Sequence, residues 1–427
     1  MMITSDVVAI IADDLTGAND SALQFYLQGA NTQILLSDAV ELEDSASVQA
    51  WAVSTETRNV SPEEAFEKVK NITQMLQDRI NPDYFFKKID STIRGNIAIE
   101  TLTILNELKW DAAIVVPAFP DEERITVGGY HLLRSMPIER TEVSSDPMAP
   151  ICESHLPTLL EGQLGQEYKQ LIGHVELKTV MKGAGPILVK INELIEQGRK
   201  LLVMDAVSNT DIEQIALAIK KIDKKILPTG TAAFAKTLAK QWFGAEDVES
   251  EQQRIIPNLP KCIISGSATQ LCATQIEKLK ADECFATVVE YNLKSENILI
   301  GVEDSFVAQV VGDLSQGKNV LIHTTGLHHS AQENSDVGIS FPSMITDYLA
   351  QLADSIKSRI ETIFVFVGGE TSFKACQAIG AMRLQLIDKV TGPIPLCLDF
   401  NGQWLVTKSG NLGNSLTMVE VIKYFER

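Results

Sequence analysis

The amino-acid sequence predicts an α/β fold with two domains, each a mostly parallel sheet flanked by helices. Apolar runs of strand length alternate with longer helical patterns almost throughout the 427 residues, as is typical of parallel sheets with right-handed crossovers. A polar, proline-bounded stretch between Trp242 and Pro260 interrupts this alternation and divides the chain. Polar or glycine-rich segments follow strand ends in both halves, so we expect the active site in the cleft between the domains.

The N-terminal domain is expected over residues 1–245, followed by a linker over residues 246–260. Its predicted strands are residues 7–12, 31–36, 49–53, 84–88, 112–116 and 200–205, and helical patterns lie between most of them, notably at 62–79 and 96–109. From residue 128 to residue 160 the pattern loosens, and prolines mark an irregular stretch. A long irregular excursion in a compact domain is often functional.

The C-terminal domain is expected over residues 261–427. Its predicted strands lie near residues 261–264, 285–290, 319–323, 362–367 and 384–388. A closing hairpin is predicted from residues 394–400 and 403–407, because Asn401-Gly402 between apolar alternations is a strong hairpin signal. The last helix is expected over residues 415–425.

Composition narrows the class of protein. Hydrophobic residues make up 45% of the chain, so each domain can bury its own core. The net charge of −19 argues against a nucleic-acid partner, and an anionic ligand would need a local positive cluster or helix N-termini. The apolar stretch at residues 7–12 is far too short to span a bilayer, and the six cysteines lack CxxC or disulfide-like spacing. We therefore expect a cytoplasmic protein without a membrane partner.

Two adjacent carboxylates, Asp13 and Asp14, end the first predicted strand. A Thr and a Gly follow and turn the chain into a helix that is expected to start near Asn19. Ligands of open α/β sheets bind just beyond the carboxyl ends of strands, where two acids can accept hydrogen bonds from a polyol or act as a base. Alternatively, one Asp caps the helix, which accounts for one carboxylate and not for both.

A positive cluster follows the strand at residues 84–88. Arg94 offers a planar fork that matches a carboxylate, and Lys88 offers a compact charge. Ser91, with its neighbour Thr92, can bond an anion or hydroxyl groups beside a helix N-terminus. In the alternative interpretation Lys87 and Lys88 are a solvated strand end, and Asp90 pairs with Arg94.

Two other strand ends carry similar residues. Arg58 follows the third predicted strand beside hydroxyl residues, and residues 116–120 form a proline-shaped loop after another strand. Parallel strands end at the same edge of a sheet, so four consecutive strand ends would gather around one cleft. This convergence favours a binding site over the solvated strand end.

Four strand-end loops in the C-terminal half have another chemistry. Glycines and small hydroxyl residues recur at residues 265–269, 323–326, 368–372 and 408–414. Such loops hold phosphates through backbone N–H groups, although each alone could be an ordinary turn, and none matches GxxxxGK[ST] or GxGxxG. Together they indicate a nucleotide site. Glu370 can help to position Mg²⁺, or it can interact with the dipole of its own helix.

These segments also carry a resemblance. The chain closely resembles the four-carbon acid sugar kinase family, which includes D-threonate, D-erythronate and 3-oxo-tetronate kinases. The matching motifs are residues 12–18 (ADDLTGA), 87–96 (KKIDSTIRGN), 116–120 (VPAFP), 146–147 (DP), 265–267 (SGS), 368–371 (GGET) and 408–410 (KSG). The chain departs from the family pattern at residues 121–126 and 133–136, which concerns the identity of the substrate more than the class of reaction.

The resemblance implies a sugar-acid-binding N-terminal domain and an ATP-binding C-terminal domain. With the reasoning from the residues, it gives as candidate substrate-binding residues Asp13, Asp14, Arg58, Lys88, Ile89, Asp90, Ser91 and Arg94. The candidate ATP-binding residues are Ser265, Ser267, Gly368, Gly369, Glu370, Thr371, Gly410 and Gly413.

The expected activity is ATP- and Mg²⁺-dependent phosphorylation of the terminal hydroxyl of a four-carbon sugar acid. Arg58, Lys88 and Arg94 would hold the carboxylate, and either Asp14 or Asp90 would accept the hydroxyl proton. The alternatives are a kinase of another small hydroxy acid or polyol, and a non-catalytic sugar-acid sensor with a nucleotide domain. Enzymes of this kind are often symmetric dimers, so a homodimer is the expected assembly.

Overall fold

The computed structural model describes residues 6–40, 42, 47–145, 149–244, 255–327 and 341–426. The chain forms two compact units, Met1–Glu249 and Ser250–Arg427, and each is described by itself. Both are α/β units built on mostly parallel sheets, so the predicted fold class is confirmed. Most of the predicted linker, and the motif at residues 146–147, lie outside the described residues.

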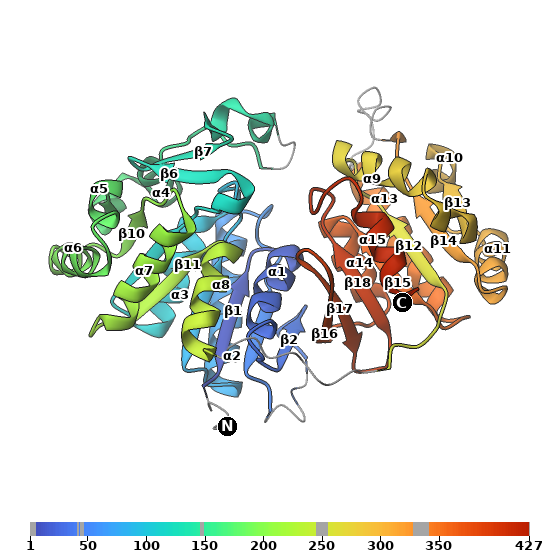
Figure 1. Ribbon diagram of the computed structural model, residues 1–427, viewed down its shortest axis with the longest axis horizontal. Helices are drawn as coiled ribbons and strands as arrows, with labels where there is room; N and C mark the ends of the chain where they lie inside the picture. The colour runs from blue at the N-terminus through green and yellow to red at the C-terminus, as the bar shows by residue number, and fades with distance from the viewer. Residues whose placement is uncertain are drawn as a thin grey trace. The chain divides into compact units, whose positions relative to one another are not determined.

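The N-terminal unit is built on a sheet with the strand order β2-β3-β1-β4-β11-β5-β10-β9, whose strands lie among the blue and green elements of Figure 1. Its strands are β1 (Val8–Ala12), β2 (Thr32–Leu35), β3 (Ala50–Ser54), β4 (Tyr84–Lys88), β5 (Ala112–Val116), β9 (Ile172–Val175), β10 (Leu201–Met204) and β11 (Ile226–Gly230). Neighbouring strands within this unit are parallel. After β1 the chain crosses to β2, returns to β3 beside β1, and then passes to β4 on the other side of β1. The switch point of the sheet therefore lies at β1, where ligands bind beyond the carboxyl ends of strands.

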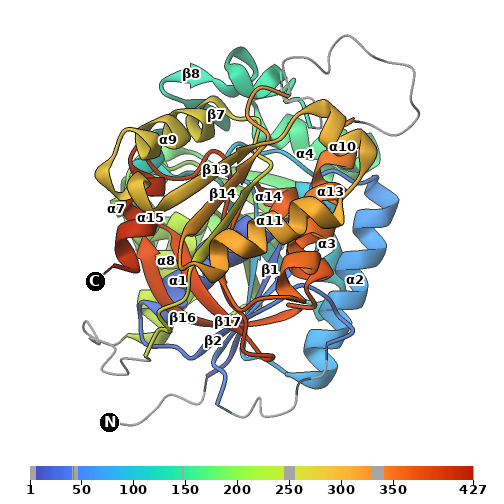
Figure 2. The same ribbon diagram turned by 90° about the vertical axis from the view of Figure 1, so that its right-hand side faces the viewer.

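Helices cover both faces of this sheet (Figures 1 and 2). One face packs against α1 (Leu15–Tyr26), α6 (Ala184–Glu196), α7 (Asn209–Lys221) and α8 (Ala232–Phe243), and the other against α2 (Pro62–Arg79), α3 (Ile97–Leu108) and α4 (Leu156–Leu164). Local sequence determines where these helices begin. For example, the Ser61 side chain accepts a hydrogen bond from the Glu64 N–H, and Pro62 occupies the first turn of α2.

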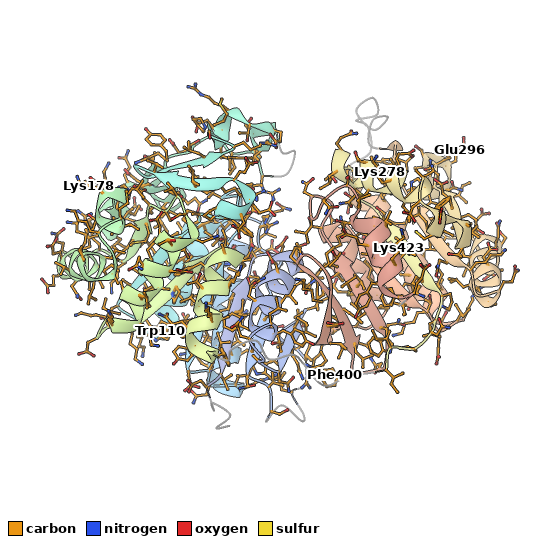
Figure 3. The ribbon with its side chains drawn as sticks, viewed as in Figure 1. Trp110, Lys178, Lys278, Glu296, Phe400 and Lys423 are labelled. Atoms are coloured by element: carbon orange, nitrogen blue, oxygen red, sulfur yellow. The ribbon has the colours of Figure 1, made fainter. Side chains whose placement is uncertain are left out.

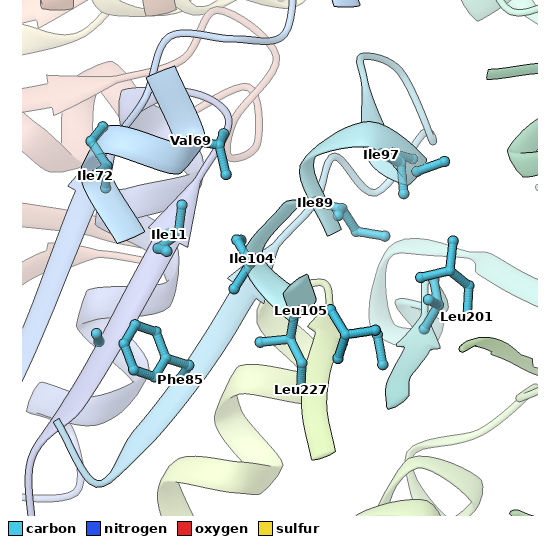
Figure 4. Close-up of a cluster of buried hydrophobic side chains, with 14 of the residues drawn as sticks. Ile11, Val69, Ile72, Phe85, Ile89, Ile97, Ile104, Leu105, Leu201 and Leu227 are labelled. Carbon is cyan, nitrogen blue, oxygen red and sulfur yellow. The ribbon is translucent and has the colours of Figure 1, made fainter. Parts of the chain in front are cut away.

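One hydrophobic core cluster of the N-terminal unit lies between the sheet and the helices α2, α3 and α4. All five residues of β1 are buried, as expected for a parallel strand covered on both faces. Figure 4 shows Ile11 and Phe85 from adjacent strands beside Ile104 and Leu105 of α3. Trp110, which is labelled in Figure 3, packs edge-on against the Phe85 ring with 5.7 Å between the ring centroids.

Two strands of this sheet were not predicted. The strand β11 contains Pro228, and a proline argues against a central strand because it cannot donate to the ladder. The structure accommodates it because β11 pairs with β4 only through Thr229 and Gly230, although it pairs with β5 along its whole length. The strand β9 has four residues, one of them Gly173, and such a short run is a weak signal.

The stretch that was expected to be irregular contains a small antiparallel sheet, so that expectation was wrong over residues 128–137. Its strands are β6 (Arg124–Val127), β7 (Tyr130–Leu133) and β8 (Met136–Pro137). Gly128 and Gly129 form the first turn with φ of 60° and 79°, and the Asp205 carboxylate accepts hydrogen bonds from both of their N–H groups. Gly-Gly between apolar alternations is a hairpin signal, and it could have been used here.

Short helical segments complete the N-terminal unit. They are α5 (Leu177–Val180) and the 3₁₀ segments η1 (Pro120–Glu122), η2 (Ile138–Arg140), η3 (Glu142–Ser145) and η4 (Gln166–Leu171).

The C-terminal unit has the strand order β13-β14-β12-β15-β18-β17-β16. Its strands are β12 (Lys261–Ser265), β13 (Val288–Asn292), β14 (Asn319–His323), β15 (Ile363–Val367), β16 (Arg383–Thr391), β17 (Ile394–Asp399) and β18 (Trp404–Lys408). The first five in this order pair in parallel, and β17 pairs antiparallel with both β16 and β18. The carboxyl ends of β12, β14, β15 and β18 therefore share one edge.

Helices also cover both faces of the second sheet. One face packs against α9 (Gln270–Lys280) and α15 (Thr417–Tyr424), and the other against α11 (Asp304–Ser315), α13 (Phe341–Lys357) and α14 (Gly369–Ala378). The 3₁₀ segment η5 (Glu283–Thr287) precedes β13, and the short helix α10 (Ser295–Ile300) follows β13. The predicted hairpin at Asn401-Gly402 is confirmed, whereas β13 begins three residues later than predicted because η5 occupies its expected start.

Among the described residues, the helices are too short or too polar to cross a lipid bilayer.

The close approach of β11 and β5 gives a test of the fold. A Cβ atom on Gly230 would lie 2.5 Å from the Val116 carbonyl oxygen, which is backbone and cannot move aside. We expect Gly230→Ala to lower the free energy of unfolding by about 1–3 kcal/mol, measured by urea unfolding.

The matched control is Gly185→Ala in α6, where a new Cβ would meet no described atom within 4 Å. A helical Gly→Ala change there should be stabilising by about 0.5–1 kcal/mol. Equal urea midpoints for Gly230→Ala and the wild type would contradict the close approach of Gly230 to the Val116 carbonyl oxygen.

Candidate functional site

Arg58 joins the carboxyl ends of three neighbouring strands. Its Nε and Nη2 atoms donate to the two Asp13 oxygens at 2.8 and 3.0 Å, and its Nη1 donates to Asp14 Oδ2 at 2.7 Å. Asp90, beyond the end of β4, lies 3.8 Å from Nη2. The sequence-predicted residues Asp13, Asp14, Arg58 and Asp90 are thus brought together at one edge of the sheet.

Asp14 is the helix cap that the alternative interpretation of the carboxylate pair proposed. Its Oδ1 accepts a hydrogen bond from the Gly17 N–H at 2.7 Å, which caps α1, while its Oδ2 faces Arg58. Because Asp14 is the cap, the helix begins at Leu15 and not near Asn19, so the predicted start was wrong.

Asp90 pairs with Arg94, as the alternative interpretation proposed. Arg94 donates from Nε and Nη2 to the two Asp90 oxygens at 2.7 and 3.1 Å, and Thr92 Oγ1 also contacts this carboxylate. Burial alone would raise the pKa of Asp90, but the Arg94 and Arg58 guanidinium groups hold it well below its usual range. Asp90 is therefore ionised at neutral pH and is a weak base.

Lys88 is a buried ammonium group at the same edge. It is 6% exposed, its Nζ donates to the Ile89 carbonyl oxygen at 2.9 Å, and it takes part in no ion pair among the described residues. A Cβ on Gly17 would lie 3.1 Å from this Nζ, so the lysine approaches the first turn of α1. Lys88 is thus a cation near the Asp14 cap, as the binding hypothesis requires.

The backbone of residues 89–91 is fixed from two sides. The Ile89 N–H donates to the Gly230 carbonyl of β11, and the His131 ring bonds the Ser91 carbonyl at 2.9 Å. Burial lowers the pKa of His131 to about 4, so the ring is neutral at pH 7 and donates to this carbonyl through Nε2–H. The small sheet therefore positions the loop that carries Ser91.

Two acids near this cluster were missed in the sequence. Glu56 has a left-handed backbone with φ of 48°, and its carboxylate accepts a hydrogen bond from the Leu15 N–H at 2.8 Å. Burial, with the nearby Asp14 charge, raises the pKa of Glu56 to about 7. Burial also raises the pKa of Asp20 to about 6, against the opposing effect of Lys88. Both lie within or next to segments that the strand-end argument had selected, so the signal was available.

A fully buried ion pair lies beneath the cluster. Lys87 Nζ is 2.5 Å from Glu100 Oε2, and both side chains are at most 1% exposed. Burial raises the pKa of Glu100, although Lys87 opposes it. Lys87 belongs to β4 and Glu100 to the first turn of α3, so the pair fixes the helix to the strand that delivers Asp90.

A pocket of about 350 Å³ adjoins Arg58. It is lined by Arg58, Asn59, Val60, Gly95, Asn96, Ala149, Pro150, Ile151, Cys152, Glu153, Leu159 and Gln163. Gly95 has φ of 88°, and a Cβ there would lie 3.3 Å from the Arg58 Cα, so a glycine allows the two loops to approach. Part of the expected excursion at 128–160 therefore lies beside the candidate site.

The strand-end loops of the C-terminal unit also converge. Thr269 Oγ1 donates to the Gly410 carbonyl at 2.9 Å, and a Cβ on Gly410 would lie 2.0 Å from Ser267 Oγ. Gly368 has φ of 117°, and a Cβ there would lie 3.1 Å from Thr371 Oγ1 and 3.6 Å from the Ser267 N. Ser267, Gly368, Thr371 and Gly410 are therefore neighbours.

The other predicted nucleotide residues surround this group. Ser265 ends β12 and contacts Cys272 of α9, with 3.3 Å between Oγ and Sγ. Gly413 has φ of 86° in the turn before α15, and Gly369 begins α14. The loop after β14 approaches as well, because the Thr324 N–H donates to the Ser265 carbonyl.

Glu370 lies in the first turn of α14, and its side chain forms an ion pair with Lys374 at 3.1 Å and accepts from Thr346 Oγ1. This arrangement supports the helix-terminus alternative. The described residues contain no cluster of three or more His, Cys, Asp or Glu side chains that could hold a metal. The donor set therefore fits Mg²⁺ only as an ion held mainly by nucleotide phosphates and water.

The raised pKa of Glu56 gives a test of the site. A carboxyl group with a higher pKa in the folded than in the unfolded chain makes the free energy of unfolding fall as pH rises between the two values, here from about 4.5 to about 7. We expect Glu56→Gln, which keeps the acceptor for Leu15, to remove this loss and to stabilise the ligand-free protein by about 1–3 kcal/mol at pH 8.

The measurement is urea unfolding of both proteins at pH 4 and pH 8. Near pH 4 the two should be almost equally stable. A stabilisation of the same size at both pH values would show that the effect does not come from titration of Glu56.

Comparison with known proteins identifies both units. Residues 8–238 match the family described as a sugar-binding N-terminal domain, and residues 262–418 match the nucleotide-binding C-terminal domain. Each match falls within one of the two compact units.

Curated relatives match over nearly the whole chain. A D-erythronate kinase of Heliobacterium modesticaldum is 28% identical and covers 98% of this chain and 96% of its own. A D-threonate kinase of Bordetella bronchiseptica is 27% identical, covering 96% of each chain. A 3-oxo-tetronate kinase of Haemophilus influenzae is 26% identical and covers 95% of this chain and 97% of its own.

A solved structure of a Haemophilus influenzae protein has the same fold. It superposes with a TM-score of 0.76 at 24% identity, and covers 98% of this chain and 99% of its own. The domain matches and the full-length relatives agree with the motifs in the sequence. The chain belongs to the four-carbon acid sugar kinase family, a family of phosphotransferases in which a sugar-binding N-terminal domain precedes a nucleotide-binding C-terminal domain.

Proposed function

We propose that this protein is an ATP-dependent kinase that phosphorylates the terminal hydroxyl of a four-carbon sugar acid. The observation that carries the proposal is the cluster of Arg58, Lys88 and Asp90 at the carboxyl edge of the sheet in the sugar-binding domain. A carboxylate-bearing polyol needs both a cation and several hydrogen-bond acceptors, and the cluster offers both. Assembly as a homodimer stays a prediction.

The cations of this cluster have different roles in our proposal. The forks of Arg58 and Arg94 are already engaged by aspartates, so they are better suited to orienting Asp14 and Asp90 than to binding the substrate carboxylate. Lys88, which has no carboxylate partner among the described residues, is the cation that receives the substrate carboxylate. The Ser91 hydroxyl would add a hydrogen bond beside it.

Asp14 is the better candidate for the general base. Asp90 is bonded to Arg94 and Thr92, and its low pKa makes it a poor proton acceptor, so it would orient a substrate hydroxyl. Asp14 shares its oxygens between a backbone N–H and Arg58, next to Lys88. In phosphoryl transfer the base acts late, so positioning of the hydroxyl contributes more than basicity.

The nucleotide would be held by the convergent loops at residues 265–269, 368–371 and 408–413. Their backbone N–H groups and hydroxyls suit the triphosphate, since such nests bind anions without requiring many charges. When bound, Mg²⁺ supplies neutralisation of the phosphate charge. Residues 121–136, which contain both departures from the family pattern and the β6–β7 hairpin, are our candidates for the choice of substrate.

The activity is tested by ADP release with Mg-ATP against a panel of acids. The panel contains D- and L-threonate, D- and L-erythronate, their 3-oxo forms and the matching uncharged polyols. We expect turnover of acids only, because a buried Lys88 requires an anionic partner. Turnover of the polyols at equal kcat/KM would contradict carboxylate recognition. Silence across the panel with ATP still bound would exclude a four-carbon substrate.

The proposed roles of Asp14 and Asp90 predict different effects of their substitution on kcat and KM. Asp14→Asn keeps an oxygen for the Gly17 N–H but loses the charge, so kcat should fall about 10²–10⁴-fold with a small change in KM. Asp90→Asn breaks the paired contacts with Arg94, so its main effect should be a higher KM.

Asp83→Asn is the matched control, because Asp83 accepts from the Val7 N–H at the amino ends of β1 and β4, away from the site. Its kinetic constants should stay at wild-type values. A loss of kcat at constant KM in Asp90→Asn would assign the base to Asp90 instead.

A further inference from the structure

Lys408 is a buried ammonium group that has no counter-ion among the described residues. It is the last residue of β18 and is 1% exposed, and its Nζ donates to the Ser409 carbonyl at 2.7 Å. No described carboxylate lies within ion-pair distance of it, whereas the equally buried Lys87 has Glu100 at 2.5 Å. One carbonyl oxygen satisfies only one of the three N–H donors of a lysine.

Such a group is costly in a protein that has nothing bound to it. Taking an ammonium out of water without an opposite charge is strongly unfavourable, so buried charges are normally paired or neutralised. Burial lowers the pKa of Lys408 to about 8. The lysine is thus mostly charged at pH 7 and lacks an anion.

Its position is among the nucleotide loops. The Gly368 N–H donates to the Lys408 carbonyl at 2.8 Å, and Gly410, two residues later, accepts from Thr269. The Lys408 backbone therefore lies against the start of the loop at residues 368–371 and two residues before Gly410, which contacts the loop at residues 265–269.

We propose that Lys408 binds a phosphate group of the nucleotide and that this phosphate is its missing counter-ion. The inference rests on the proposed function, since it assigns a residue within the ATP site. A lysine suits this role because it is a compact point charge with three donors that can reach more than one phosphate oxygen. It would explain how loops that otherwise offer neutral donors attract a polyanion to a chain with a net charge of −19.

The test compares nucleotide affinities of Lys408→Met, Lys408→Arg and the wild type by titration calorimetry with ATP, ADP and adenosine. We expect Lys408→Met to weaken ATP and ADP binding by about 10–100-fold, as for loss of a hydrogen-bonded charge, and to leave adenosine binding within about twofold. Lys408→Arg keeps the positive charge in a larger side chain, so it should weaken ATP and ADP binding less than Lys408→Met does.

Lys261→Met is the matched control. Lys261 is 7% exposed and begins β12 in the same sheet, at the opposite edge, where its Nζ lies 5.4 Å from the centroid of the Phe425 ring. Its removal should leave the affinities for ATP, ADP and adenosine unchanged.

Thermal unfolding provides a second readout that a structural lysine would not give. Without nucleotide, Lys408→Met should melt at or above the wild-type temperature, because an unpaired buried charge has been removed. With ATP, the wild type should be stabilised far more than the variant. A ligand-free variant that melts well below the wild type would overturn the proposal.

The two proposals fail differently. If the wild type binds ATP and Lys408→Met binds it equally well, or loses adenosine and ATP affinity alike, Lys408 is not a phosphate ligand and the kinase proposal stands. If the wild type itself binds no ATP, both proposals are overturned.

Discussion

The ion-pair network around Arg58 is the constraint on which the candidate substrate site depends. Arg58 follows β3, Asp13 and Asp14 follow β1, and Asp90 follows β4, so one guanidinium ties together the loops of three neighbouring strands. Because these groups are largely buried, each charge is tolerable only while its partners are present. Asp14 extends the network into the backbone by capping α1, which fixes the helix relative to the same edge.

Both units present a buried lysine at the carboxyl end of a parallel strand. Lys88 ends β4 and donates to the Ile89 carbonyl, and Lys408 ends β18 and donates to the Ser409 carbonyl. In a chain with a net charge of −19, these two groups place positive charge where anionic ligands are proposed to bind. Burial keeps each charge from being screened by solvent and makes binding of an anion correspondingly favourable.

The parts of the fold that could be predicted are those that the local sequence pattern determines. Buried parallel strands such as β1 read as continuous apolar runs, and the Asn401-Gly402 turn is determined by backbone conformations that few residues adopt. The strand β11 could not be predicted, since Pro228 is acceptable only because of which residues pair on either side. These strand pairings belong to the tertiary structure and cannot be predicted from a short stretch of sequence.

The sequence predicted which residues belong to the candidate sites better than it predicted what each residue does there. Strand-end logic selected Arg58, Asp90 and Arg94, but the sequence could not tell whether each arginine binds substrate or an aspartate. Those pairings depend on distances between separate strands. Glu56 lies next to a strand end that the sequence argument had selected, so it could have been named, but its raised pKa comes from burial near Asp14 and depends on the tertiary structure.

The account is tested most directly by a crystal structure with the acid that the enzyme turns over. We predict that the substrate carboxylate lies within hydrogen-bond distance of Lys88 Nζ, with the Arg58 contacts to Asp13 and Asp14 intact. A carboxylate bound by Arg58 in place of Asp13, or an acid bound away from the carboxyl ends of β1, β3 and β4, would contradict it.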